Sequence, residues 1–270
     1  MTESLMPKIV DASEFVIAFS TKDDGNMLRT NETRIAVHNN RLRFFEKRGI
    51  RPSDLIVVRT SHSSNIDVID RTSDGYMRHT YLGAPVIETD FDFYYSGSDG
   101  ALTFRSDLHV GLMSGDCVPV MIWDNVSGLH GILHVGLLGA LNQMVMGLPR
   151  VFAAIGVRLE DTHYYLGPSI TQKNYNVSRS GLWNAIEDQI YDKVPEVEDF
   201  ILKRSDGEYF DLQGLITSQL LEIGVSMERL QRYEHCIADP ESMFLSHNVL
   251  KQGGERGNFF SVIVRLPKLP

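Results

Sequence analysis

The chain has 270 residues, 43% of them hydrophobic, and carries 26 basic against 35 acidic residues, for a formal net charge of −9. This acidic balance argues against nucleic-acid binding, which needs a basic face to neutralise phosphates. The length allows a large buried core, and no linker, repeat or low-complexity tract divides it, so we expect a single domain spanning residues 1–270.

The sequence also indicates where the protein works. Cys117 and Cys236 are the two cysteines, too few for the disulfide framework of a small secreted protein. Residues 1–15 lack the basic and apolar regions of a signal peptide. The most apolar window, residues 129–148, contains histidines, amides and glycines, which favour a buried strand and helix over a membrane span. We therefore expect a cytoplasmic protein that does not enter a membrane.

The N-terminal part predicts a strand, a helix and a second strand. Residues 14–20 (EFVIAFS) are typical of a strand, and residues 32–48 show apolar spacing compatible with an amphipathic helix that carries Arg41. A strand over residues 54–60 (DLIVVRT) then enters a polar loop that contains His62. Functional residues often occupy such loops, although an ordinary surface histidine would also be found there.

The central stretch, residues 109–139, holds two apolar runs separated by a turn-like connector at residues 124–128. This pattern predicts two buried strands joined as a hairpin. Cys117 interrupts the first run and His134 the second, 17 residues apart (134 − 117). Strand pairing could bring the thiol and the imidazole together. Taken alone, a buried cysteine or a histidine in an apolar run is more often an inert core residue than a catalytic one.

The remaining elements are predicted from apolar periodicity and turn residues. They are a pair of strands with irregular connections within 67–97, a helix over 140–155, a strand over 162–168, a helix over 210–224, and strands over 232–236 and 259–266. Strands outnumber helices, and the helices are interspersed among them. This pattern predicts an α+β, or mixed α/β, fold built on mixed β-sheets.

His62, Cys117 and His134 supply two imidazoles and one thiol, a ligand set that zinc accepts. Three protein ligands leave a fourth position for water or substrate. The spacing is long, and the sequence contains no HExxH, zinc-deaminase, GxSxG or P-loop motif. A cysteine nucleophile activated by histidine without a metal is therefore an alternative reading of the same residues.

Several short blocks occur in a fixed order from about residue 30 to the C-terminus. They are Asn40-Arg41, His62, Gly100–Thr103 followed by Ser114–Val120 (SGDCVPV), His134–Gly139 (HVGLLG), Gly167–Ile170 with Tyr175–Val177, and Asp211-Leu212. Together these blocks resemble the laccase-domain family, whose members are called multicopper polyphenol oxidase, peptidoglycan editing factor and purine nucleoside phosphorylase.

The resemblance implies a mixed α/β fold with layered sheets and a metal or catalytic centre formed by His62, Cys117 and His134. It implies that Arg41 holds phosphate, and Arg256 matches a later arginine of the family. The expected activity is purine nucleoside phosphorolysis, with adenosine deamination and methylthioadenosine cleavage also reported for family members. The expected partners are a purine nucleoside and phosphate, and the expected metal is zinc rather than copper.

The chain departs from the family pattern beside these residues. Leu137-Leu138 stand where the family has Trp-Arg, Lys173-Asn174 replace paired cysteines, and residues 244–248 lack the family arginine. Two other readings therefore stay open. One is a cysteine-dependent hydrolase or amidase acting on a peptidoglycan precursor, and the other is a family member that binds ligand without turning it over.

Overall fold

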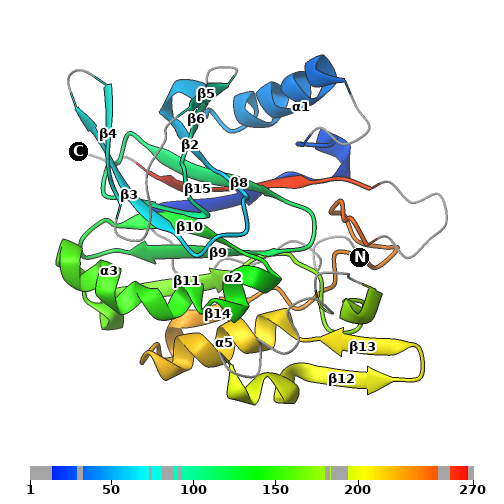
Figure 1. The fold of residues 1–270 in the computed structure, drawn as a ribbon. Coiled ribbons are helices and arrows are strands. Elements are labelled where there is room, and N and C mark those ends of the chain that lie inside the picture. Colours follow the sequence, from blue (N-terminus) through cyan, green and yellow to red (C-terminus); the bar gives the residue numbers. More distant parts are fainter. Residues whose placement is uncertain are drawn as a thin grey trace.

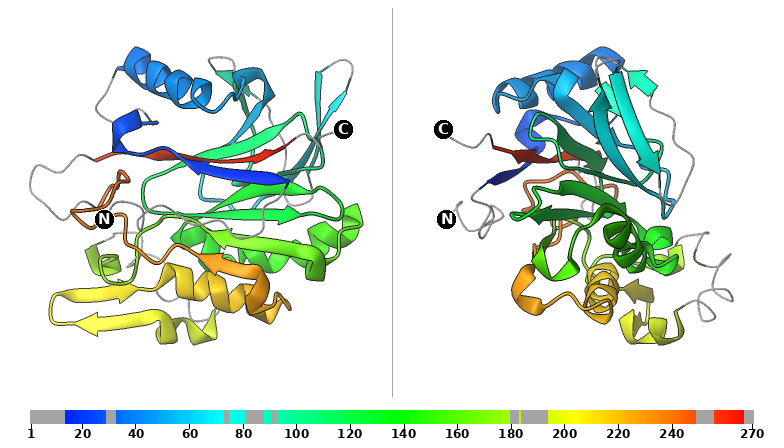
Figure 2. Two further views of the ribbon diagram at one scale, coloured as in Figure 1. Left: turned by 180° about the vertical axis from the view of Figure 1, so that it is seen from behind. Right: turned by 90° about the vertical axis from the view of Figure 1, so that its left-hand side faces the viewer.

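The computed structural model describes residues 14–28, 33–72, 75–80, 88–90, 93–179, 183, 194–248 and 256–266. Two large β-sheets pack face to face, and helices cover their outer faces (Figures 1 and 2). Helix α1 lies over one sheet, whereas α2, α3 and α5 lie over the other (Figure 1). The expected mixed α/β fold with layered sheets and flanking helices is confirmed.

The first sheet has six strands in the order β1-β15-β8-β2-β6-β5. Strand β2 runs parallel to both β8 and β6, and the other pairs are antiparallel. The strands are β1 (Phe15–Phe19), β2 (Leu55–Val58), β5 (Glu88–Asp90), β6 (Phe93–Tyr95), β8 (His109–Ser114) and β15 (Phe259–Arg265).

The second sheet has seven strands in the order β14-β11-β9-β10-β7-β3-β4. Its centre is the antiparallel hairpin of β9 and β10, in which His134 is paired with Pro119. The strands are β3 (Ile66–Thr72), β4 (Gly75–Thr80), β7 (Gly100–Thr103), β9 (Val118–Asp124), β10 (His130–Val135), β11 (Thr162–Leu166) and β14 (Leu230–Arg232). A separate hairpin pairs β12 (Ile201–Arg204) with β13 (Gly207–Phe210).

The α-helices whose bounds the described residues give are α1 (Arg34–Glu46), α2 (Leu137–Leu141), α3 (Leu148–Ile155) and α5 (Leu212–Glu222). Thr33 caps α1 by accepting a hydrogen bond from the Ala36 amide, and Asp211 caps α5 by accepting one from the Gly214 amide. Short 3₁₀ turns occupy Lys22–Asp24, Pro52–Asp54, Met144–Gly147, Leu159–Asp161, Val177–Arg179, Pro195–Phe200 and Met227–Arg229. None of the described helices is long and apolar enough to cross a membrane.

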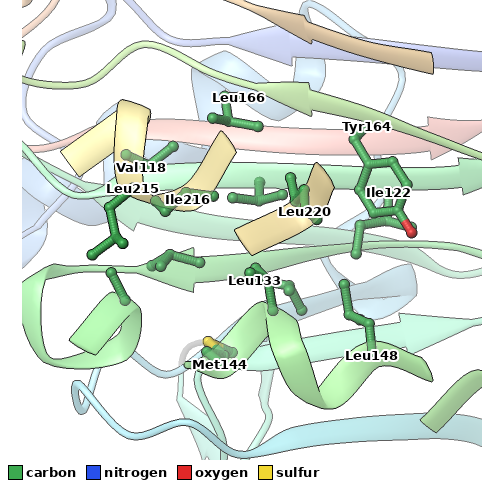
Figure 3. Close-up of a cluster of buried hydrophobic side chains, with 14 of the residues drawn as sticks. Val118, Ile122, Leu133, Met144, Leu148, Tyr164, Leu166, Leu215, Ile216 and Leu220 are labelled. Atoms are coloured by element: carbon green, nitrogen blue, oxygen red, sulfur yellow. The ribbon is translucent and has the colours of Figure 1, made fainter. Parts of the chain in front are cut away.

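Among the described residues, three large hydrophobic cores fill the spaces between the layers, and a small fourth cluster surrounds Cys236. Alternate residues of β9 serve different cores: Val120 and Ile122 pack with α5, whereas Met121 faces the six-stranded sheet. Figure 3 shows the core beneath the helices, where β9, β10 and β11 meet α5 and Leu148 of α3. A third core, with Phe44 and Phe45, lies between α1 and the six-stranded sheet. Because the central strands are buried on both faces, their sequences read as continuous apolar runs.

Most predicted elements are confirmed within a few residues, and four differ. The first central run is divided at Gly115–Cys117, so that β8 joins the six-stranded sheet and β9 the other. The helix expected over 140–155 is broken, because Gln143 adopts a left-handed conformation. The strand expected over 232–236 ends at Arg232, because β14 pairs with β11 only as far as Leu166. One pair of strands was expected within 67–97, but two pairs are present: β3 with β4 in the seven-stranded sheet, and β5 with β6 in the six-stranded sheet.

Candidate active site

Three connections cross from one sheet to the other at a single edge. Strands β2, β6 and β8 are parallel to one another, so their carboxyl ends lie together. From these ends the chain crosses into β3, β7 and β9 of the seven-stranded sheet. The crossing segments and the side chains they carry are 59–65 with His62, 96–99 with Asp99, and 115–117 with Cys117.

His134 reaches the same edge from β10. It lies opposite Pro119 in the hairpin, and Cys117 precedes Pro119 by two residues. Residues two apart on a strand share a face, so Cys117 and His134 are diagonal neighbours on the face toward the six-stranded sheet. The prediction that strand pairing brings this thiol and this imidazole together is confirmed.

His62, Cys117 and His134 converge, with one ligand atom from each lying within 4.8 Å of the others. The Cys117 Sγ lies 3.9 Å from His62 Nε2. The two imidazole rings meet edge to face, with centroids 5.1 Å apart. His134 is buried, Cys117 is half-buried and His62 is exposed, so the group opens toward solvent on the His62 side.

Asp99 joins His62 and His134 of this group, and its role was not predicted from the sequence. Its buried carboxylate accepts a hydrogen bond of 2.8 Å from His134 Nδ1 and further hydrogen bonds from Ser61, His62 and Ser63. In the sequence, Gly97-Ser98-Asp99-Gly100 has the composition of an ordinary turn. The one available signal was a carboxylate at a strand boundary.

The electrostatics of the group follow from these contacts. Burial alone would raise the pKa of Cys117, but the charge and hydrogen bonds of the two histidines lower it to about 7. Burial lowers the pKa of His134, and the Cys117 thiolate and Asp99 outweigh this and raise it to about 9. Hydrogen bonding to Cys117 raises the pKa of His62. Burial opposes ionisation of Asp99, yet hydrogen bonds from His134 and the two serines lower its pKa to about 2. Without a metal, the site therefore favours a thiolate beside imidazolium.

A polar wall formed by Asp116, Ser246 and Asn248 lies next to Cys117. The half-buried Asp116 accepts hydrogen bonds from the Ser246 hydroxyl at 2.6 Å and from the Asn248 amide at 2.8 Å. Burial, followed by the charges of Cys117 and Asp116, raises the pKa of Tyr175.

The two arginines assigned to phosphate lie in different surroundings. Arg41 lies on α1 with its side chain buried, where its Nε donates to the Met27 carbonyl at 2.8 Å and one Nη lies 3.1 Å from Met113 Sδ. Arg256 is exposed and forms a parallel bridge with Ser246, the residue whose hydroxyl binds Asp116. Arg256 is therefore tied to the polar wall of the site, and the contacts described for Arg41 lie in the core beneath α1.

The two leucines that depart from the family pattern also differ from each other. Leu137 is buried in the core beneath the helices, and Leu138 is half-buried. Cys236, the other cysteine, is buried with Ile170 and Ala238, in agreement with a core role.

The three converging side chains can hold a metal ion. They offer two nitrogens and one sulfur, the donor types that zinc prefers. In a tetrahedral zinc site with bonds of about 2.0–2.3 Å, neighbouring ligand atoms lie roughly 3.3–3.8 Å apart. The spacing within 4.8 Å therefore requires only a small contraction. Because Asp99 occupies His134 Nδ1, the other ring nitrogen, Nε2, is left to act as the ligand.

The chain is therefore a mixed α/β protein of two facing sheets that gathers two histidines and a cysteine at their common edge. The chain belongs to the family described as multi-copper polyphenol oxidoreductase laccase, whose family model matches residues 19–266.

Two relatives show the range of activities in similar chains. A purine nucleoside phosphorylase of Mycobacterium tuberculosis is 25% identical over 229 residues, which cover 84% of this chain and 79% of the relative. An adenosine deaminase, RL5, from an unknown prokaryotic organism is 22% identical over 223 residues, covering 80% and 77%.

Solved structures share the fold. YlmD from Geobacillus stearothermophilus has a TM-score of 0.76 at 24% identity, and 94% of this chain and 93% of YlmD are covered. The hypothetical protein YfiH from Bacillus licheniformis has a TM-score of 0.75 at 22% identity, with 95% and 94% covered. At these identities the likeness shows the fold alone.

Proposed function

We propose that this chain is a purine nucleoside phosphorylase, that the same site also supports adenosine deamination and methylthioadenosine cleavage, and that residues 1–270 form one catalytic domain. The observation that carries the proposal is the convergence of His62, Cys117 and His134 within 4.8 Å at an edge open to solvent. The names of the relatives, purine nucleoside phosphorylase and adenosine deaminase, support the substrate class.

We assign zinc to the three side chains. The same donor set occurs in copper sites that transfer electrons, but a catalytic zinc site keeps one position open to substrate, as the exposure of His62 allows. When bound, zinc supplies a Lewis acid that polarises a substrate atom. His62, Cys117 and His134 would hold the ion, and Asp99 would fix the orientation of His134.

Phosphorolysis places further demands on the protein. It needs a cation to hold phosphate beneath the sugar and a proton for the departing purine. Arg256, which forms a β-bridge with Ser246 of the polar wall, and Arg41, on α1, are the arginines that we assign to phosphate. Asp116, next to Cys117 in the chain, would line the side of the site nearest the thiol.

The decisive experiment incubates the purified protein with adenosine, inosine and methylthioadenosine, with and without phosphate. Bound zinc and copper are measured in the same preparation. We expect phosphate-dependent release of the free base and one zinc per chain. We expect Cys117→Ala to lose both, because it removes the thiolate ligand.

Cys236→Ala is the matched control, because Cys236 is the other cysteine and is buried in a separate core. It should retain zinc and turnover. If Cys117→Ala turned over nucleosides as fast as the unmodified protein, the proposed site would be wrong. Turnover that does not depend on phosphate would instead identify a hydrolase or deaminase.

One observation favours a second candidate, a cysteine-dependent hydrolase or amidase acting on a peptidoglycan precursor. The half-buried Cys117 thiol lies 3.9 Å from an imidazole nitrogen of His62, as in a Cys-His nucleophile pair. This candidate predicts that a thiol reagent labels Cys117, that a cell-wall precursor prevents labelling and that chelators have no effect. Protection of Cys117 by zinc would contradict it.

A further inference from the structure

We propose that Asp99 is the positioning residue that assembles His62 and His134 into one site. This inference rests on the proposed function of the site and extends it to a residue outside the three ligands. Asp99 would act through the two histidines rather than on the substrate.

The contacts of Asp99 are concentrated on the site. Its carboxylate is fully buried and accepts five hydrogen bonds. Oδ1 accepts from the His62 amide at 2.9 Å and from His134 Nδ1 at 2.8 Å. Oδ2 accepts from the Ser61 hydroxyl at 2.6 Å, and from the amide and hydroxyl of Ser63 at 2.7 Å and 2.6 Å. One carboxylate therefore joins the loop of one histidine to the ring of the other.

The first consequence concerns the ring of His134. Because Nδ1 donates its proton to Asp99, Nε2 is the nitrogen that remains for a ligand. The main chain of Asp99 strengthens this arrangement, since its carbonyl accepts a hydrogen bond of 2.7 Å from the His134 amide. Asp99 is thus bound to His134 through both its backbone and its side chain.

The second consequence concerns the backbone of His62. This residue has a φ of 61°, in the left-handed region that non-glycine residues seldom occupy. Such a conformation persists where surrounding contacts determine it, and it is frequent at ligand sites. Four of the five hydrogen bonds to Asp99 come from residues 61–63, on both sides of His62 and from its own amide. They hold the strained residue with its ring toward His134.

A carboxylate alone satisfies this set of donors. All five partners donate, and an asparagine would present one NH₂ group in place of an acceptor. If that group replaced Oδ2, it would face the Ser63 amide, which also donates. If it replaced Oδ1, it would face the His62 amide and would force His134 to accept at Nδ1, which moves the proton to Nε2. Either orientation of the amide therefore disrupts the contacts of residue 99 with the His62 loop or with the ring of His134.

The test compares Asp99→Asn with Asp124→Asn. Asp124 is also buried and also accepts from loop donors, the amides of Val126 and Ser127, but it lies at the other end of β9 from Cys117. Two quantities are measured: zinc affinity by competition with a chelator, and the proton NMR signal of His134 Nδ1–H. This proton is identified by its loss in His134→Gln, and it should be far downfield and slow to exchange.

We expect Asp99→Asn to weaken zinc binding about 10- to 100-fold, the range typical for partners of metal ligands, and to shift or abolish the Nδ1–H signal. Asp124→Asn should change neither quantity, whatever it does to stability. Unchanged zinc affinity and an unchanged signal in Asp99→Asn would overturn the proposal.

A second variant covers the case in which Asp99→Asn does not fold. Ser61→Ala combined with Ser63→Ala removes the two hydroxyl donors that bind Asp99 from the loop around His62, and it keeps the hydrogen bond between Asp99 and His134. It should weaken zinc binding while the Nδ1–H signal stays in place, and unchanged zinc affinity would overturn the proposal.

The NMR signal requires neither zinc nor turnover, so the two proposals can fail separately. A signal that depends on Asp99 in a protein that does not cleave nucleosides would support the positioning role and reject the proposed function. Nucleoside turnover with a signal that is independent of Asp99 would do the reverse.

Discussion

At the scale of single residues, the site depends on a backbone position as well as on side chains. Gly136 follows β10 directly and lies against the site, so that a Cβ atom there would be 2.8 Å from Cys117 Sγ and 3.1 Å from His62 Cδ2. Both separations are shorter than ordinary van der Waals contact. The close approach of the chain, rather than an unusual φ, is what requires glycine at this position.

Gly136→Ala should therefore displace Cys117 and His62 and lower both zinc affinity and nucleoside turnover, by roughly 10- to 100-fold if the shift approaches 1 Å. Gly139→Ala is the matched control in helix α2, because the nearest atoms to its Cβ would lie 3.7 Å away. It should leave turnover unchanged and stabilise the helix by up to about 1 kcal/mol. Chelator competition and denaturant unfolding measure the two effects. Equal turnover in the two variants would show that the contact at Gly136 is unimportant.

At the scale of elements, the directions of the strands build the site. Parallel strands place successive carboxyl ends at one edge of the six-stranded sheet. Each segment that leaves these ends carries one of His62, Asp99 and Cys117 across to the other sheet. Helix α5 contributes indirectly, because Leu215, Ile216 and Leu220 pack on the sheet that contains β9 and β10 (Figure 3). Its first turn is fixed by the Asp211 carboxylate, which accepts from the Gly214 amide at 2.8 Å.

Asp211→Ala should lower the free energy of unfolding by about 1 kcal/mol, because it removes an N-cap acceptor from an otherwise unpaired helix amide. Asp211→Asn keeps an acceptor of similar strength and should stay close to the unmodified protein. Denaturant unfolding of the three proteins gives the comparison. A loss in the asparagine variant as large as in the alanine variant would show that the charge of Asp211, rather than capping, stabilises α5.

At the scale of the whole molecule, the core between the sheets contains a buried histidine, His130, that lies outside the candidate site. His130 is fully buried at the start of β10, with its ring nitrogens 3.2 Å from the Gly128 carbonyl and 3.0 Å from the Leu108 carbonyl. Phe15 of β1 packs against the ring. Burial lowers the pKa of His130 to about 4, so this histidine is neutral in the folded protein at neutral pH.

This histidine predicts a pH dependence of stability. The pKa is about 4 in the folded protein against the ordinary value of 6.5, so the unfolded chain binds more protons between those values. Stability contributed by neutral His130 is therefore present above about pH 6.5 and is lost as the pH falls toward 4. The loss between about pH 7 and pH 4.5 should be about 2 to 3 kcal/mol.

The measurement is denaturant unfolding at both pH values for the unmodified protein, His130→Gln and His235→Gln. His235 is exposed and serves as the matched control. His130→Gln should show a smaller difference between the two pH values, and His235→Gln the same difference as the unmodified protein. An unchanged difference in His130→Gln would assign the acid sensitivity to other groups.

The sequence by itself determined much of the local structure and the residue types that meet at the candidate site. Periodicity and turn residues predicted β1, α1, α5 and the hairpin of β9 and β10, because these elements depend on which residues are apolar along a short stretch. The residue types of His62, Cys117 and His134 predicted the ligand set, which the structure brings together. The role of Arg41 in holding phosphate stays a prediction.

Only the tertiary structure decided how these pieces combine. A run of strand residues buried on both faces looks the same in either sheet, so the sequence did not show that β8 and β9 separate at Gly115–Cys117. Asp99 was missed for a related reason. Its partners, residues 61–63 and His134, lie 35 or more residues away in the chain, and they meet it only because parallel strands end at the same edge. Local patterns carry no information about contacts of that range.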